Sequence, residues 1–332
     1  MDGVNKAFQY IDDFDPNDLL DLPVTSLCER FGGPVILRID GEKKPPLLLS
    51  TLLHGNEWTG YHAIQQFIRQ HNSSKLPRET FLLLGNVEAA AANARFLEGQ
   101  SDFNRIWDKD SEALWSPVLE SIDFKHLFAC VDMHNNSGKS PHYAIVSKHD
   151  PVHYQLAKLF GSKMIHLEQP AAALSIYLSQ YLPAITLESG LSDELDGLKQ
   201  TSQFLKRLYS LEKISQTPPE EIELYETLAS MHVPEGCRFG FSEEDDLDIK
   251  FQAGVSKLNF SNCPKGTVLA KSAKLHSLEL RPCQKDQADL DGLLHFEGPN
   301  ICLSESLVPS MLTENTDAIK KDCFGYLMRR IK

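Results

Sequence analysis

The sequence lacks the features of membrane and secreted proteins. It has no apolar run near the roughly 20 residues of a membrane-spanning helix. Its first residues, Met1 to Lys6, lack the basic segment and apolar core of a secretory signal. Cysteine is sparse, with seven in 332 residues and no Cys-x-x-Cys pair, which favours scattered reduced thiols over a disulfide framework. We therefore expect a cytoplasmic protein with no membrane partner.

Positive charge is also scarce. The formal net charge is −13, whereas proteins that bind the phosphate backbone of nucleic acids carry a basic surface. Phosphate-binding glycine motifs, serine-centred nucleophile turns and zinc-finger spacings are absent as well. These absences exclude nucleic acid as an expected partner and leave other enzyme chemistries open.

Apolar runs and helical patterns alternate between about residues 35 and 210, which is typical of a mainly parallel sheet with helices on both faces. The first clear unit is the apolar run Leu47–Leu53, a turn, and apolar residues from Trp58 to Ile68 at helical spacing. We expect further strands at 35–39, 81–84, 128–133, 143–146 and 184–187, and helices at 88–96, 152–160, 171–182 and from Ser192, which can cap the last of them.

The pattern of residues changes after residues 215–220, a stretch with Ser, Thr and Pro that we interpret as a linker. Beyond it, short apolar runs alternate with Gly and Pro turns. We therefore expect an α/β domain at 1–215 and a small, mostly β domain at 221–332. The sequence leaves the oligomeric state open.

The turn after the Leu47–Leu53 run carries His54 and Glu57. Residues three apart share a helical face, so the imidazole and the carboxylate can meet. The turn falls at the carboxyl end of a strand, where open α/β sheets bind ligands, and a nitrogen and an oxygen ligand together suit zinc. The alternative is an ordinary helix start, in which Asn56 is the cap and Glu57 complements the helix dipole.

Two further expected strands end in residues of the same kind, namely His134 and Glu188. Parallel strands present their carboxyl ends at one edge, so these side chains become neighbours of His54 and Glu57. Two His and one Glu form the ligand set of a catalytic zinc, which lowers the pKa of a bound water to about 7. Glu188 can take the proton from that water, although a solvated strand-end carboxylate would look the same in sequence.

Three more residues are candidates for this site. Asp132 lies two residues before His134 and so points to the same side of an extended chain. There it either orients the imidazole by a hydrogen bond or serves only as a structural partner. Asn104 and Arg105 place an amide beside a guanidinium, which suits binding of a carboxylate; the alternative for Arg105 is a surface position in a loop.

Together these motifs resemble the succinylglutamate desuccinylase/aspartoacylase family of the zinc carboxypeptidase-like superfamily. The matching segments are His-Gly-Asn-Glu at 54–57, Asp-Phe-Asn-Arg at 102–105, Asp-Met-His at 132–134 and the later Glu188. The resemblance covers roughly residues 45–200, and residues 259–270 look like the C-terminal β domain of the family. Phe103 replaces the usual Leu, and residues 99–101 look like a small insertion.

The resemblance implies one zinc ion per chain, held by His54, Glu57 and His134, with Glu188 as general base and acid. It also implies that Asn104 and Arg105 contact a substrate carboxylate, and that Arg95 polarises the scissile carbonyl or contacts the substrate. The implied activity is hydrolysis of the amide bond of an N-acyl amino acid or a similar small molecule. One alternative is a peptidase of the same superfamily, acting on peptides or cell-wall stems. Another is a non-catalytic zinc-binding protein.

Overall fold

The computed structural model describes residues 6–108, 114–115, 122–242, 246–285, 290 and 292–332. The chain forms two compact units. The first comprises Met1–Asn135, His142–Met164 and Pro170–Ile222, and the second comprises Asn136–Pro141, Ile165–Gln169 and Glu223–Lys332. The expected domain limits, 1–215 and 221–332, stay predictions. Among the described residues no helix combines the length and the apolar character needed to cross a membrane.

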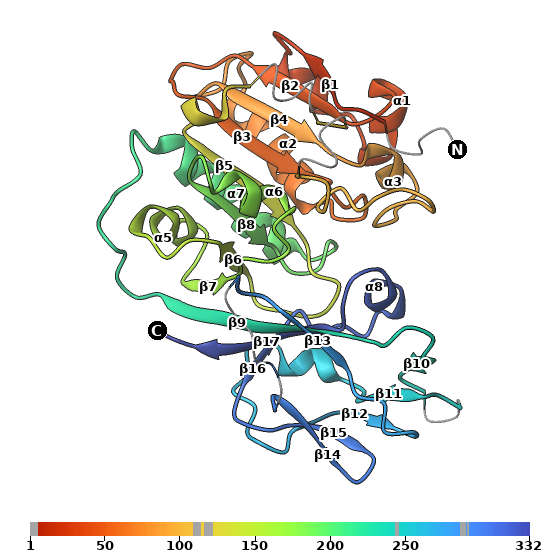
Figure 1. The fold of residues 1–332 in the computed structure, drawn as a ribbon. Coiled ribbons are helices and arrows are strands. Elements are labelled where there is room, and N and C mark those ends of the chain that lie inside the picture. The colour runs from red at the N-terminus through yellow and green to blue at the C-terminus, as the bar shows by residue number, and fades with distance from the viewer. Residues whose placement is uncertain (1–5, 109–113, 116–121, 243–245, 286–289, 291) are drawn as a thin grey trace. The chain divides into compact units, whose positions relative to one another are not determined.

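The first unit is built on a mixed, largely parallel sheet in the order β1-β2-β4-β3-β5-β8-β6 (Figure 1). The pairs β1–β2, β4–β3, β3–β5 and β5–β8 are parallel, and β2–β4 and β8–β6 are antiparallel. The strands are β1 (Gln9–Ile11), β2 (Val35–Ile39), β3 (Leu47–Thr51), β4 (Thr80–Leu84), β5 (Ala129–His134), β6 (Tyr143–Val146) and β8 (Ala184–Glu188); β7 (Lys163–His166) falls at the limit between the units.

Helices pack on both faces of this sheet. The glycine at position 60 lets α2 pack closely against the strand β5, because a Cβ at that position would lie only 2.7 Å from Met133 Cβ. On the other face, Leu174 and Leu178 of α6 join the core that contains Leu48 and Cys130. The helices of the unit are α1 (Leu27–Phe31), α2 (Thr59–His71), α3 (Val87–Ala91), α5 (Pro151–Lys158), α6 (Leu174–Leu178) and α7 (Leu195–Ser210), with 3-10 turns at Pro16–Leu19, Val24–Ser26 and Phe124–His126.

The second unit is mostly β structure with its own apolar core. Strand β9 pairs antiparallel with β13 and β17, and β17 pairs with β16. A five-stranded sheet has the order β10-β11-β12-β15-β14. The elements are β9 (Glu223–His232), β10 (Phe239–Gly240), β11 (Ile249–Phe251), a 3-10 turn (Val255–Leu258), β12 (Val268–Ser272), β13 (Glu279–Pro282), β14 (Leu294–Glu297), β15 (Asn300–Leu303), β16 (Val308–Ser310), α8 (Thr316–Lys321) and β17 (Gly325–Arg330).

The predicted fold class is confirmed: a largely parallel sheet flanked by helices, with a small C-terminal β region. Several details were wrong. The helices expected at 88–96 and 171–182 are single short turns, α3 and α6, and β1 was not expected. Asn56 does not cap α2, whose N-cap is Trp58 without a side-chain hydrogen bond. Ser192 does not cap α7 either, because the helix begins later, at Leu195, with Glu194 as its N-cap. The Ser192 hydroxyl donates to the carbonyl of Asn56.

Candidate metal centre and active site

The turn that follows β3 is held tightly by its own backbone. The Glu57 amide donates to the His54 carbonyl (3.2 Å), and the Trp58 indole N–H donates to the Gly55 carbonyl (2.6 Å). Position 55 must be glycine, because a Cβ there would lie 2.2 Å from the backbone nitrogen of Ala90 in α3. The turn therefore directs His54 and Glu57 to the carboxyl edge of the sheet.

The neighbouring strands supply the other polar side chains of the site. In the parallel pairing of β5 with β8, His134 lies opposite Glu188, so the two side chains project side by side from the same face. Asp132 precedes His134 by two residues and shares that face. All three residues are buried.

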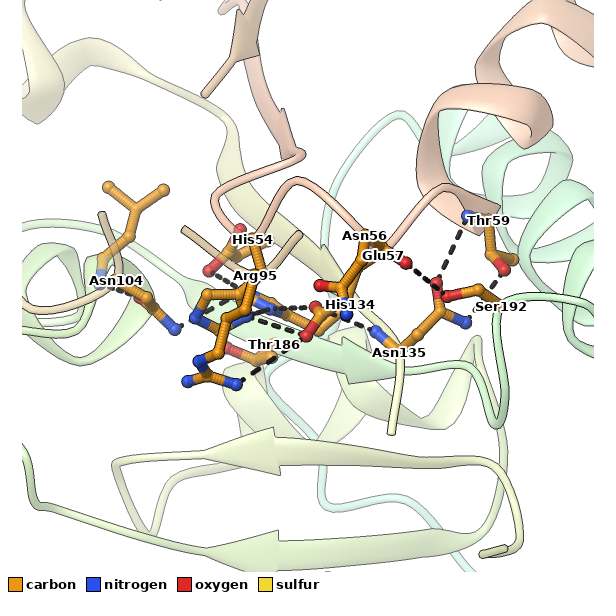
Figure 2. Close-up of polar contacts among 12 residues, drawn as sticks. His54, Asn56, Glu57, Thr59, Arg95, Asn104, His134, Asn135, Thr186 and Ser192 are labelled. Atoms are coloured by element: carbon orange, nitrogen blue, oxygen red, sulfur yellow. Dashed lines mark hydrogen bonds and ion pairs between the residues drawn. The ribbon is translucent and has the colours of Figure 1, made fainter. Parts of the chain in front are cut away.

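His54, Glu57 and His134 converge, and we call them the His–Glu–His group (Figure 2). The Nδ1 atom of His54 lies 2.8 Å from Glu57 Oε1, and the Nδ1 atom of His134 lies 2.7 Å from Glu57 Oε2. The two Nδ1 atoms are 3.2 Å apart. Each residue is at most 8% exposed.

The outer nitrogens of both imidazoles face carboxylates. His134 Nε2 lies 2.8 Å from Asp132 Oδ2, and His54 Nε2 lies 3.1 Å from Asp102 Oδ1. A carboxylate partner favours the proton on Nε2 and so leaves the lone pair on Nδ1. Both Nδ1 atoms and the Glu57 carboxylate then offer lone pairs to the same point. This donor set fits a divalent metal ion, and two nitrogens with one carboxylate oxygen suit zinc.

The charges around the group are consistent with a cation-binding site. Burial lowers the pKa of His134, but Asp132 and Glu57 outweigh it and raise that pKa well above its usual value. Burial disfavours ionisation of Glu57, yet the two imidazoles lower the pKa of its carboxyl. The pKa of Asp102 is likewise well below its usual range despite burial, because His54 and Arg95 stabilise the carboxylate. The lowered pKa values of Glu57 and Asp102 therefore place two ionised carboxylates beside the imidazoles.

Glu188 differs from these carboxylates. Burial raises the pKa of its carboxyl to about 8, an effect that nearby His134 opposes and nearby Glu57 reinforces. A carboxyl group whose pKa lies near neutral pH can both accept and release a proton in a reaction cycle. Glu57 and Asp102, whose pKa values are lowered, could not do so at neutral pH.

Arg95 and Asp102 form an ion pair beside the His–Glu–His group. Arg95 Nη2 lies 3.0 Å from Asp102 Oδ2, and Arg95 Nη1 lies 4.0 Å from Glu57 Oε1. The ion pair joins the two ends of the stretch that contains residues 99–101, which look like an insertion in the sequence. Within that segment the buried Gln100 side chain accepts from the Leu97 amide (2.9 Å) and from Asn86 Nδ2 (2.9 Å). Arg95 is thus held next to the centre despite the longer interval.

The amide of Asn104 has a defined orientation. Its Oδ1 atom accepts a hydrogen bond from the Leu174 backbone N–H at the start of α6 (3.0 Å). The NH₂ group must therefore point the other way, and it lies 3.4 Å from His134 Nε2 (Figure 2). Arg105 Nη1 donates to the backbone carbonyl of Asn104 (2.9 Å), and the Arg105 charge contributes to the low pKa of Asp102.

Comparison with known proteins assigns the chain to a family. A family model described as "Succinylglutamate desuccinylase/Aspartoacylase catalytic domain" matches residues 43–213, which contain every site residue named above. The chain belongs to this family. No match was found among curated protein sequences.

Several solved structures have a fold similar to that of this chain. Succinylglutamate desuccinylase from Chromobacterium violaceum has a TM-score of 0.51 at 18% identity, with 76% of this chain and 89% of that chain covered. Succinylglutamate desuccinylase/aspartoacylase from Rhodobacter sphaeroides scores 0.58 at 15% identity, covering 89% and 88%. Murine aminoacylase 3 scores 0.56 at 16% identity, covering 87% and 97%.

The sequence predicted no role for two polar residues of this family member's site, although Asp102 lies in the Asp-Phe-Asn-Arg motif. Asp102 contacts His54 and Arg95, and Asn135 contacts Glu57 through its backbone N–H (3.1 Å). Asp102 could have been found, because a metal-binding histidine nearly always donates its outer nitrogen to an acceptor, and only His134 had been given one. No comparable signal pointed to Asn135.

Proposed function

We propose that the protein is a zinc-dependent deacylase that hydrolyses the amide bond of an N-acyl amino acid or a similar small molecule. The observation that carries the proposal is the placement of Glu188 directly beside His134 in the β5–β8 register, next to three converging ligand atoms. Family membership supports hydrolysis of an amide by a deacylase. Bound to His54, Glu57 and His134, zinc would supply Lewis acidity, polarising an acyl carbonyl and acidifying water.

In this proposal the Glu188 carboxylate takes a proton from the attacking water as the new C–O bond forms. The same carboxyl then gives that proton to the leaving nitrogen as the C–N bond breaks. The products are a carboxylic acid and a free amino acid. The pKa of about 8 suits a group that must both accept and donate.

The roles of the remaining residues follow from their donors. Asn104, whose NH₂ orientation is fixed by the Leu174 N–H, and Arg105 bind the carboxylate of the substrate. A guanidinium and an amide N–H together present several parallel donors to a carboxylate. Arg95, held by Asp102 beside Glu57, contacts the acyl carbonyl. Asp132 and Asp102 orient the two imidazoles.

A substrate panel tests this proposal. Zinc-loaded protein is assayed with acetyl-, succinyl- and formyl-amino acids and with short peptides, and release of the free amino acid is measured. The matched control is Glu188→Gln, which keeps the shape of the side chain but cannot accept a proton. Loss of a general base typically costs about 10²–10⁴-fold in rate. Near-normal turnover in Glu188→Gln with zinc still bound would show that the base lies elsewhere, and cleavage of peptides alone would favour the peptidase alternative.

A further inference from the structure

Asn135, the residue after His134, joins three segments of the site. It is 5% exposed. Its Nδ2 atom donates to the Gly190 carbonyl (3.0 Å) and to Thr59 Oγ1 (2.8 Å), and its Oδ1 atom accepts from the Thr59 backbone N–H (3.2 Å). Its own backbone N–H donates to Glu57 Oε2 (3.1 Å). One side chain therefore connects the start of α2 with the segment that follows β8. Figure 2 shows Asn135 and Thr59 side by side.

The bond to Gly190 extends the pairing of β5 with β8 beyond its backbone ladder. That ladder runs through His134 opposite Glu188 and ends with the Ser189 N–H on the His134 carbonyl (3.0 Å). Gly190 has φ = +73°, and a Cβ there would lie 2.9 Å from Glu194 Oε2. The chain turns sharply only two residues after Glu188, and at this turn the Gly190 carbonyl is held to the residue that follows β5.

The other half of the connection lies in α2. Thr59 is the first residue of that helix and follows the metal-ligand candidate Glu57 by two residues. Asn135 thus holds the strand end with the proposed base and the turn with Glu57 at the same time. A second link joins the same two segments, because Ser192 Oγ donates to the Asn56 carbonyl (2.8 Å).

We propose that Asn135 is a positioning residue that sets the place of the Glu188 carboxylate relative to the His–Glu–His group. It acts through the Gly190 carbonyl and does not touch the substrate. The inference rests on the proposed function, since it concerns the base of that reaction. A buried amide whose donors and acceptor are all engaged is costly to disturb, because each lost partner leaves a buried polar group unsatisfied.

The test is a double-mutant cycle between Asn135→Ala and Glu188→Gln. The alanine variant keeps the backbone N–H to Glu57 and loses the side-chain bonds, so zinc content should stay the same. We expect kcat to fall about 10- to 100-fold with little change in KM, because small displacements of a reacting group can cost about 100-fold. In the Glu188→Gln background Asn135→Ala should cost almost nothing further, since the group it positions is already disabled.

A matched control separates the Gly190 bond from general destabilisation. Thr59→Val removes the hydroxyl that accepts from Asn135 but keeps the Gly190 bond, so it should leave kcat close to that of the wild type. Should Asn135→Ala fold poorly, Asn135→Asp keeps the size of the side chain and the acceptor for the Thr59 N–H while removing both donors, and it should show the same loss of kcat.

Two results would overturn the inference. One is an equal loss of kcat from Asn135→Ala in the wild-type and Glu188→Gln backgrounds. The other is wild-type kcat in Asn135→Asp. The proposed function fails separately, on the wild-type chain in the substrate panel, so the two failures cannot be confused.

Discussion

The two histidines of the His–Glu–His group are positioned by different means. His134 belongs to what we term the strand-built half, which consists of Asp132, His134 and Glu188 on paired β5 and β8. His54 belongs to the loop-built half, which consists of His54, Glu57, Arg95, Asp102 and Asn104 on turns and loops. Each half supplies a carboxylate to the Nε2 atom of its own imidazole. The distance is 2.8 Å for Asp132 and His134 and 3.1 Å for Asp102 and His54.

The difference lies in what holds each carboxylate. Asp132 is fixed by the backbone, because it lies two residues before His134 on one strand and is fully buried. Asp102 lies 48 residues from His54, and it keeps its position through side-chain bonds to Arg95 and through the Asn104 backbone N–H, which donates to Asp102 Oδ1 (2.8 Å). The strand-built half should therefore tolerate side-chain changes around it better than the loop-built half does.

The largest effect should come from removing a proposed ligand in either half. In His54→Ala and in His134→Ala we expect bound zinc to fall from about one ion per chain to almost none, with loss of deacylase activity, because two ligands rarely hold zinc in a protein. Elemental analysis of purified protein measures the metal. Unchanged metal content in both variants would contradict the assignment for both halves.

The carboxylate partners give the next largest effect and separate the halves. Replacing such a partner typically costs about 10–100-fold in metal affinity or activity. Asp132→Asn should weaken zinc binding in that range and leave KM nearly unchanged. Asp102→Asn should weaken zinc binding similarly and also raise KM, because Arg95 loses its ion pair.

Zinc competition with a chelator and steady-state kinetics on the same preparations measure both quantities. Asp108→Asn is a matched control for the loss of a loop carboxylate, since Asp108 belongs to neither half. If Asp102→Asn and Asp132→Asn changed zinc affinity and KM to the same extent, the two halves would not differ in function.

The same division explains how much the sequence could predict. Asp132, His134 and Glu188 were predicted from two regularities of strands, the alternation of side chains and the alignment of parallel strand ends. His54 and Glu57 were found from local spacing. No role was predicted for Asp102 and Asn135, because no periodicity encodes contacts that depend on loop paths. For Asp102 the one available signal was the acceptor that the outer nitrogen of His54 requires. The short α3 and α6 were overestimated for a related reason, since helix-permissive composition does not fix where a helix ends.

Arg105, the residue after Asn104 of the loop-built half, should show a moderate effect. Lys offers a point charge in place of a planar fork of donors, so Arg105→Lys should raise KM about 10-fold and Arg105→Ala about 100-fold, in line with a charged hydrogen bond worth roughly 1.5–3 kcal/mol. If the contact tightens in the transition state, kcat should fall as well. A substrate whose carboxylate is amidated should be poor for the wild type and should lose little more in Arg105→Ala. Equal losses with acid and amide substrates would show that Arg105 has a structural role.

The smallest effect should come from removing Asn86, the N-cap of α3, which contacts the segments of the loop-built half. Asn86 Oδ1 accepts from the Ala89 N–H at the start of α3 (3.0 Å), and Asn86 Nδ2 donates to the Gln100 side chain (2.9 Å). Loss of an N-cap costs about 0.5–2 kcal/mol of stability, so Asn86→Ala should lower the free energy of unfolding by that amount. Because α3 lies against Gly55 and Gln100 anchors the segment between Arg95 and Asp102, KM should also rise a few-fold.

Asn315→Ala is the matched control and removes the cap of α8 in the second unit, where Asn315 Oδ1 accepts from the Asp317 and Ala318 amides. It should cost similar stability and leave KM unchanged. Urea unfolding measures the free energy of unfolding of both variants, and steady-state kinetics measure KM. An unchanged KM in Asn86→Ala would mean that the loop-built half keeps its geometry without the Asn86 hydrogen bonds.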